Sequence, residues 1–153
     1  MEPDVVHGER TFVTRSPEET EALAEKLARG LEPGTVLALD GELGAGKTCF
    51  VRGLARGLGV RDDVSSPTYA LVHEYEGARG LTLVHADLYR LGGVAEARSL
   101  GLEDWLGRAG TVVVVEWADR APELFEHGAA RIELERTAGD ERSIVVAGLP
   151  EPT

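Results

Sequence analysis

The glycine-rich segment at residues 41–48, GELGAGKT, constrains the fold of this chain more than any other feature. It matches the pattern Gly-x-x-x-x-Gly-Lys-Ser/Thr, which binds phosphate when a strand precedes it and a helix follows. Residues 35–40, TVLALD, form a compact apolar run typical of a buried strand, and residues 49–58 carry apolar side chains at helical spacing. The order strand, glycine loop, helix predicts an α/β domain with a phosphate-binding loop.

Each part of this motif has a physical role. Glycines let the backbone turn with its N–H groups pointing inward, and the helix N-terminus adds a partial positive charge. We expect Lys47 to reach the β- and γ-phosphate oxygens of ATP, and the Thr48 hydroxyl to bind Mg²⁺. The predicted nucleotide-binding residues are Gly41, Glu42, Leu43, Gly44, Ala45, Gly46, Lys47, Thr48 and Cys49. A chance match in a glycine-rich chain is the alternative, and the flanking strand and helix argue against it.

The net charge of the chain limits its partners. The 153 residues include 27 Asp and Glu against 16 Lys and Arg, a formal net charge of -11. A protein that binds nucleic acid directly normally presents a basic face, so tight RNA or DNA binding by this chain alone is not expected. An anionic nucleotide must instead be held by a local positive concavity, as a phosphate loop provides.

Cysteine content and hydropathy bear on location and domain number. Cys49 is the single cysteine, so no intrachain disulfide can form. No apolar run approaches the roughly 20 residues of a membrane helix, and we expect a cytoplasmic protein without membrane contact. The length suits one domain over residues 1–153, with residues 149–153 as a loose tail.

Other segments predict the remaining elements. Ser16 as N-cap, Pro17 at the first helical position and Glu19 three residues after the cap form a capping box, and the helix they start ends near Gly30. A second buried strand is expected at residues 111–115, TVVVV. Further expected elements are a strand at 10–15, two strands joined by a turn at 69–75 and 81–91, short helices within 92–107, and a hairpin of 130–136 with 143–147.

Two carboxylates are candidates for the catalytic chemistry. Glu116 follows four consecutive valines, and phosphate-loop hydrolases place a carboxylate at the end of a buried strand to hold Mg²⁺ or its waters. A solvent-exposed strand end is the alternative. If residues 81–91 stay extended, His85, Asp87 and Tyr89 share one face. His85 could equally be a core histidine, Tyr89 a packing residue and Asp87 the cap of a helix or turn.

Residues 65–68, SSPT, follow the helix after the glycine loop, where related nucleotide switches carry a loop that senses the γ-phosphate. An ordinary Ser/Pro turn is the alternative. Trp117 is more typical of a core residue.

The chain has no asparagine and hence no Asn-Lys-x-Asp guanine signature, which favours ATP over GTP.

Four segments together, GELGAGKT, SSPTYALVHEY, VHADLYRL and VVVVEWADR, resemble the TsaE (YjeE) family in order and spacing. The resemblance extends from the first strand to Asp119. It implies a three-layer α/β P-loop domain with a mixed, largely parallel central sheet, to which a C-terminal β-hairpin would be added. It also implies a bacterial ATPase that acts with TsaD and TsaB in making threonylcarbamoyladenosine in tRNA, meeting tRNA only through that complex.

The resemblance also implies roles for single residues. Lys47 and Thr48 would serve the phosphates and Mg²⁺, with Asp87 and Glu116 near the metal and the γ-phosphate. Cys49 departs from the pattern, because many members have a second hydroxyl residue there. The segment Ser66, Pro67 and Thr68 would form a switch-like loop, and the other positions that match family motifs are Tyr89, Arg90 and Trp117.

The mechanism expected is attack of a positioned water on ATP, with Lys47, Mg²⁺ and the loop amides stabilising the transferred phosphoryl group. Asp87 or Glu116 would orient the water. The sequence shows no evident arginine finger, although Arg90 is a candidate, so a partner is expected to complete the site. Two other functions stay open: a small-molecule kinase, and a non-catalytic module whose docking surface is fixed by ATP.

Overall fold

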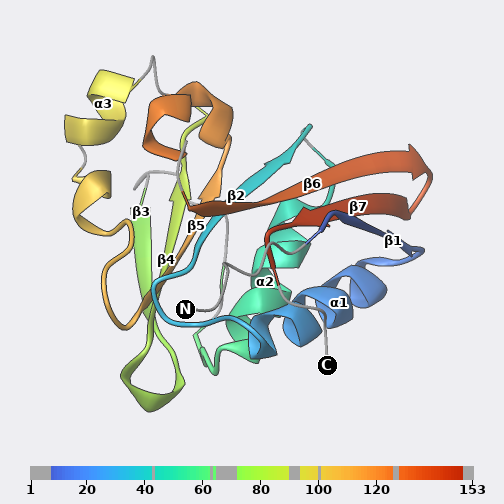
Figure 1. Ribbon diagram of the computed structural model, residues 1–153. Coiled ribbons are helices and arrows are strands. Elements are labelled where there is room, and N and C mark those ends of the chain that lie inside the picture. The colour runs from blue at the N-terminus through green and yellow to red at the C-terminus, as the bar shows by residue number, and fades with distance from the viewer. Residues whose placement is uncertain are drawn as a thin grey trace.

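The computed structural model describes residues 8–42, 44–62, 64, 72–89, 94–99, 101–125 and 128–149. Within these residues seven strands form one sheet, in the order β1-β7-β6-β2-β5-β4-β3 (Figure 1). The strands are β1 Arg10–Thr14, β2 Val36–Gly41, β3 Val72–Glu76, β4 Thr82–Asp87, β5 Thr111–Glu116, β6 Ala129–Ala138 and β7 Glu141–Ala147. The α-helices are α1 Pro17–Arg29, α2 Lys47–Gly57 and α3 Val94–Ser99, and the 3₁₀ helices are η1 Ala78–Gly80, η2 Leu102–Asp104, η3 Ala118–Arg120 and η4 Pro122–Phe125.

The sheet is parallel in its centre and antiparallel at its margins. Strand β2 pairs in parallel with β5 and β6, and β5 pairs in parallel with β4. Strands β1, β7 and β6 are antiparallel neighbours, as are β3 and β4. The prediction of a mixed, largely parallel central sheet with a C-terminal hairpin is confirmed. All six residues of β5 are buried, as expected of a valine run between two covered faces.

Helices cover both faces of the sheet, which confirms the three-layer architecture (Figure 1). Alternate residues of β5 divide between two cores because successive side chains point to opposite faces. Val112 and Val114 pack with Phe50 and other residues of α1 and α2. Val113 and Val115 pack in the second core, whose members from outside the sheet include Leu88, Ala97, Leu102, Ala118, Ala121 and Phe125. No helix in the described part of the chain is long and apolar enough to span a membrane.

The predicted start of α1 is confirmed in its main feature. The Ser16 hydroxyl accepts a hydrogen bond from the backbone N–H of Glu19 at 3.1 Å, and Pro17 occupies the first turn. The Glu19 carboxylate, however, accepts from the N–H of Arg15 at 3.2 Å, one residue before the cap. The helix ends at Arg29, and Gly30 follows as its C-cap.

The strand expected over residues 81–91 is shorter than predicted. Strand β4 ends at Asp87, whose Oδ1 accepts a hydrogen bond from the backbone N–H of Tyr89 at 2.9 Å. This local bond turns the chain, as aspartate side chains often do. Tyr89 therefore lies beyond the strand and is 40% exposed, and the expectation that it shares a strand face with His85 and Asp87 is wrong.

Leu149 is buried, although the sequence placed it in a loose tail. It belongs to the core beneath α1, and its carbonyl accepts a hydrogen bond from Arg10 Nη2 at 2.6 Å. The bond joins the end of the described chain to β1, which is the outer strand on that side of the sheet. Residues 150–153 lie outside the described residues.

Helices α1 and α2 approach each other closely at Gly53. A Cβ atom added to this residue would lie 2.2 Å from the Glu21 carbonyl oxygen and 2.7 Å from Ala24 Cβ. Backbone atoms of a packed helix cannot yield locally, so a side chain here would force the two helices apart. The contact holds α2, and with it the loop that precedes α2, close to the rest of the domain.

We expect Gly53→Ala to destabilise the protein. Alanine improves helix propensity by about 1 kcal/mol, but the clash with α1 outweighs this gain and gives a net loss of about 2 kcal/mol. Equilibrium unfolding in urea measures the change. Gly8→Ala is the control, because an added Cβ there meets nothing within 4 Å. Equal stability of wild type and Gly53→Ala would contradict this packing argument.

Candidate nucleotide site

The glycine loop joins the end of β2 at Gly41 to the start of α2 at Lys47. Gly46 is the N-cap residue and has φ 101°, a conformation that favours glycine strongly over other residues. Glu42 and Gly44 are exposed, Ala45 is buried, and Thr48 and Cys49 in the first turn of α2 are half-buried. Leu43 lies outside the described residues. The strand, loop and helix predicted around this motif are confirmed.

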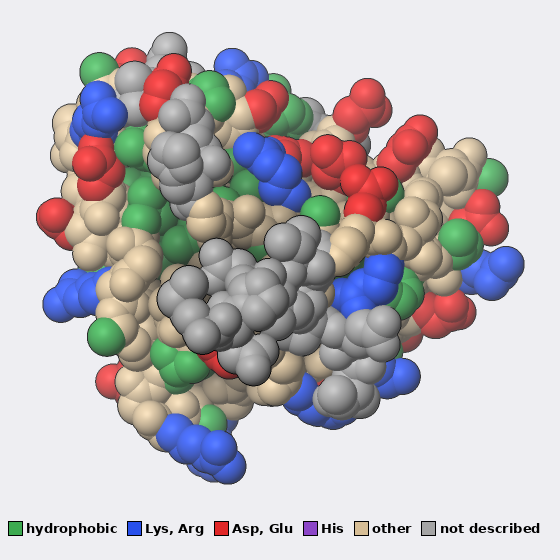
Figure 2. Space-filling model, in the orientation of Figure 1, with side chains coloured by type: hydrophobic (Ala, Val, Ile, Leu, Met, Phe, Trp, Pro, Cys, Tyr) green, Lys and Arg blue, Asp and Glu red, His purple; other side chains and the backbone are tan. Residues whose placement is uncertain are grey.

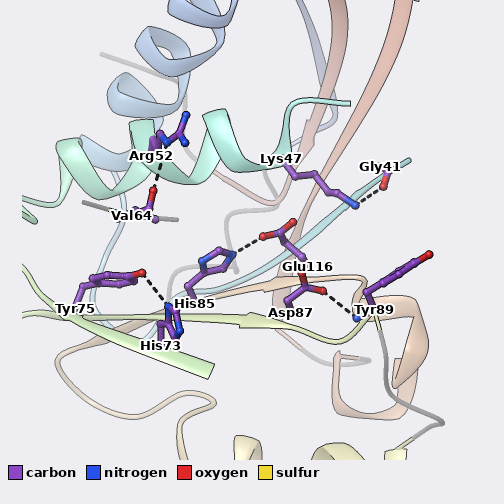
Figure 3. Close-up of polar contacts among 10 residues, drawn as sticks. All are labelled: Gly41, Lys47, Arg52, Val64, His73, Tyr75, His85, Asp87, Tyr89 and Glu116. Atoms are coloured by element: carbon purple, nitrogen blue, oxygen red, sulfur yellow. Dashed lines mark hydrogen bonds and ion pairs between the residues drawn. The ribbon is translucent and has the colours of Figure 1, made fainter. Parts of the chain in front are cut away.

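Lys47 is 6% exposed and lies among polar and aromatic groups at the mouth of the loop. Its Nζ donates a hydrogen bond to the Gly41 carbonyl at 2.5 Å (Figure 3). The same Nζ lies 3.8 Å from the centroid of a Trp117 ring. Burial lowers the pKa of Lys47, while the carboxylates of Glu116, Asp87, Asp40 and Asp119 act in the opposite direction. An ammonium has three donors, so this contact leaves N–H groups for an incoming anion.

Asp87 and Glu116 lie side by side at the ends of adjacent parallel strands, where they are register partners. Glu116 is 3% exposed, so the alternative of a strand-end glutamate in solvent is wrong. Asp87 is half-buried. Burial raises the pKa of Asp87, against the effect of the Tyr89 backbone hydrogen bond, and the nearby Glu116 carboxylate raises it further. Figure 3 shows both side chains on the side of the sheet that carries Lys47.

His85 is fully buried and contacts Glu116 directly, with 2.5 Å between His85 Nε2 and Glu116 Oε2. His85 Nδ1 has no hydrogen-bond partner among the described residues. A buried N–H without an acceptor is costly, so the proton is best placed on Nε2, where it is donated to the carboxylate. The histidine therefore fixes one oxygen of Glu116.

The oxygen atoms of the side chains at this site suit Mg²⁺ when nucleotide phosphates supply further ligands. Thr48, Asp87 and Glu116 offer hydroxyl and carboxylate oxygens, the hard ligands that Mg²⁺ prefers. Among the described residues, no group of three or more His, Cys, Asp and Glu side chains could hold a metal ion by itself. Mg²⁺ is commonly bound through one or two carboxylates together with phosphates and water, and these residues fit that mode.

An aromatic and cationic stack borders the site. The Tyr89 and Trp117 rings lie 4.9 Å apart, and the Arg120 guanidinium is 5.7 Å and 5.8 Å from their centroids. Trp117 has φ 58°, which is unusual for a residue other than glycine, asparagine or aspartate. The interpretation of Trp117 as mainly a core residue is incomplete, because one face of it meets Lys47.

Comparison with known proteins identifies the family to which this chain belongs. The family model described as "Threonylcarbamoyl adenosine biosynthesis protein TsaE" matches residues 14–144. The chain belongs to the TsaE family. It is 42% identical over 131 residues to the TsaE protein of Bacillus subtilis, covering 86% of this chain and 80% of that protein. It is 39% identical over 135 residues to the TsaE protein of Treponema pallidum, covering 88% of this chain and 98% of that protein.

A solved structure supports the same assignment. The crystal structure of Bacillus subtilis YdiB superimposes with a TM-score of 0.71 at 35% sequence identity, covering 97% of this chain and 90% of that one. The resemblance stated from the four motifs is therefore confirmed, as is the P-loop fold. The TsaE family takes part in the biosynthesis of threonylcarbamoyladenosine in tRNA.

The structure of this TsaE-family protein places only some of the predicted site residues. It brings together Gly41, Lys47, Asp87, Glu116 and Trp117. The switch-like segment Ser66, Pro67 and Thr68 lies outside the described residues, as does Arg90, and their roles stay predictions. No role was predicted for Arg120, the last residue of the EWADR motif, because its contacts with the Tyr89 and Trp117 rings leave no signal in the sequence.

Beside the loop of this TsaE-family protein, a second surface is acidic. Figure 2 shows red side chains gathered over the ends of β2 and β6. A pocket of about 500 Å³ lies there, and its acidic lining residues are Asp40, Glu42, Glu133 and Glu135. Burial raises the pKa of Asp40, and Arg131 opposes this from 3.7 Å. Such a wall repels phosphate, so the favourable approach for an anion is on the Lys47 side.

Asp87→Asn is expected to stabilise the nucleotide-free protein. Because burial and Glu116 raise the folded-state pKa of Asp87, the folded state binds its proton more tightly than the unfolded state. The ionised Asp87 carboxylate therefore lowers the free energy of unfolding. This loss grows as the pH rises from the ordinary aspartate pKa through the folded-state pKa of Asp87, and it is complete at neutral pH. The gain in unfolding temperature should be present at pH 7 and vanish toward pH 3. Asp62→Asn, at an exposed position, is the control. A gain that is the same at both pH values would contradict this reasoning.

The His85 contact predicts a second stability effect. His85→Leu removes the donor to buried Glu116 and leaves a polar group without its partner, at a cost of about 3 kcal/mol. His85→Gln can place an amide N–H near the same position and should recover much of that loss. Urea unfolding of both variants measures the difference. Equal destabilisation by leucine and glutamine would mean that packing, and not the hydrogen bond, decides the effect.

Proposed function

We propose that this protein binds ATP with Mg²⁺ and hydrolyses it, as the ATP-hydrolysing component of tRNA threonylcarbamoyladenosine synthesis, acting with TsaD and TsaB in the cytoplasm. One observation carries the proposal: the nearly buried Lys47 ammonium lies at the mouth of the glycine loop, beside the paired carboxylates Asp87 and Glu116. This combination offers a phosphate site and acidic groups for water and metal in one place.

Different groups of the chain would bind the phosphates and the metal ion. The loop amides and Lys47 hold the phosphates, and phosphate oxygens replace or join the Gly41 carbonyl as acceptors for the ammonium. Mg²⁺ would be held by Thr48 and a carboxylate, and it supplies neutralisation of charge on the phosphates. Placing a reactant in a fixed position supplies much of the remaining rate enhancement.

The two carboxylates differ in ways that suit different roles. Glu116 is buried and has one oxygen fixed by His85, which suits a rigid acceptor near the metal. Asp87 is half-buried, and its raised pKa makes it a stronger proton acceptor than an ordinary aspartate. We therefore assign orientation of the attacking water to Asp87 and support of the metal to Glu116.

The role of partners follows from charge and from family membership. The family modifies tRNA, yet this chain carries a formal net charge of -11 and an acidic wall beside its loop. Contact with tRNA is therefore better provided by TsaD and TsaB than by this protein. A partner would also supply the groups that complete the catalytic site, so hydrolysis by the protein alone is expected to be slow.

Phosphate release from ATP tests the proposal. Lys47→Ala should lower the rate by about 100-fold or more, because the group that neutralises charge on the phosphoryl oxygens is lost. Lys26→Ala is the matched control, since Lys26 is the chain's other lysine and is exposed on α1. Each protein is measured alone and with TsaB–TsaD. A wild-type rate that is equal in both conditions would refute completion of the site by partners.

Two further measurements separate the other functions. Retained tRNA modification by Asp87→Ala, despite lost hydrolysis, would favour a nucleotide-switched docking module. A phosphorylated small molecule that appears without matching free phosphate would favour a kinase. The proposal expects neither result.

A further inference from the structure

Arg142 of the C-terminal hairpin contacts the outside of the phosphate-binding loop. Its Nε donates a hydrogen bond to the Ala45 carbonyl at 3.0 Å, and its Nη2 donates to the Gly44 carbonyl at 3.2 Å. Its Nη1 donates to the carbonyls of Gly139 at 2.8 Å and Glu141 at 3.1 Å, both at the tip of the hairpin. One guanidinium thus joins two loop carbonyls to the β6–β7 turn.

We propose that Arg142 is a positioning residue, which orients the peptide groups of the loop for phosphate binding. The proposal rests on the proposed function, because it concerns how the same loop receives a nucleotide. In a trans peptide the C=O and the next N–H point in opposite directions. Drawing the carbonyls of Gly44 and Ala45 toward Arg142 therefore turns the N–H groups of Ala45 and Gly46 away from it.

The geometry of the guanidinium suits this task. Its five N–H donors lie in one rigid plane, so it can bind two neighbouring carbonyls at once and still reach a third and a fourth. The Ala45 N–H donates to the Glu42 carbonyl at 3.0 Å, so it is already engaged in the turn of the loop. The Gly46 N–H, which is coupled to the Ala45 carbonyl, is the group whose direction Arg142 controls most directly.

The positive charge of Arg142 also makes the loop N–H groups better donors to phosphate. A cation at the carbonyl end of a peptide polarises it and makes its N–H a better donor at the other end. Arg142 also places a positive charge beside the loop, in a chain whose neighbouring wall carries Asp40 and Glu42. The hairpin therefore contributes to the electrostatics of the loop as well as to its shape.

Arg136 provides a matched comparison within the hairpin. It is the register partner of Arg142 on β6, and its Nε donates to the same Gly139 carbonyl at 2.9 Å. In the described part of the chain it makes no hydrogen bond to the loop. Removal of Arg136 should disturb the hairpin tip in a similar way while leaving the loop carbonyls bound to Arg142.

Calorimetry with Mg-ATP and with Mg-ADP tests the proposal on the full chain. Arg142→Ala should weaken binding of both nucleotides by about tenfold or more, because charge-assisted hydrogen bonds that orient the loop are lost. Arg142→Lys should recover little, since an ammonium cannot form the planar fork. Arg136→Ala should bind both nucleotides as wild type does.

Hydrogen exchange in the absence of nucleotide gives a second readout. The amide of Ala45, which donates to the Glu42 carbonyl, should exchange faster in Arg142→Ala than in wild type, while amides of the central strand β5 keep their protection. A purely structural loss would instead lower protection throughout the domain. If Arg142→Ala does not fold, Arg142→Lys carries the same test, and wild-type affinity in that variant would overturn the proposal.

The remaining outcomes are also decisive. Equal nucleotide affinity of wild type and a folded Arg142→Ala would overturn the positioning role, as would an equal loss in Arg136→Ala. If wild type itself binds neither nucleotide, the proposed function fails, which is a different result from failure of the Arg142 proposal.

Discussion

Parallel pairing of β2, β5 and β4 is the constraint on which the site depends. Parallel strands end at the same edge of a sheet, so this pairing brings Gly41, Glu116 and Asp87 together from segments distant in the sequence. Register is as important as direction. A slip of one residue in β5 would turn Glu116 to the opposite face, away from His85. The four valines alone would accept either register, because both of their faces are buried in apolar cores, so the contact that such a slip would lose is the hydrogen bond of Glu116 to His85.

Burial of charged groups at the site lowers the stability of the folded protein, and a bound nucleotide would offset part of that loss. Burial makes the charged form of Lys47 less favourable, and burial likewise opposes ionisation of Asp87. Their mutual attraction offsets part of this cost, as does the contact of the ammonium with the Gly41 carbonyl and the Trp117 ring. Phosphates would give Lys47 a stronger partner, and a cation would relieve the repulsion between Asp87 and Glu116. The groups whose burial costs stability would therefore also be the groups that favour binding.

Local patterns predicted most of the fold, whereas contacts between distant segments escaped them. The capped start of α1, the glycine loop and the valine run of β5 are local signals, and each was confirmed. Tyr89 was wrongly placed on the strand, because alternation of polar and apolar residues does not reveal that the Asp87 carboxylate accepts a hydrogen bond from the Tyr89 N–H and ends the strand. The contact of His85 with Glu116 spans 31 positions, and that of Arg142 with Ala45 spans 97. No sequence period connects residues so far apart, so only the register of the sheet and the path of the hairpin bring them together.

The two sides of the site differ in how firmly the chain itself holds them. On one side, Lys47 binds the Gly41 carbonyl from within the loop and Arg142 binds the Gly44 and Ala45 carbonyls from outside, so hydrogen bonds from the chain itself hold the loop. On the other side, the Tyr89 side chain is exposed and contacts the Trp117 ring at a tilt of 48° and the Arg120 guanidinium across its face, and such contacts impose less directional restraint than hydrogen bonds. Phosphate recognition needs the first kind of surface, because its donors must be fixed before the anion arrives. The proposed completion of the site by a partner is compatible with the second kind, since an exposed aromatic side chain at the rim is accessible to an incoming chain.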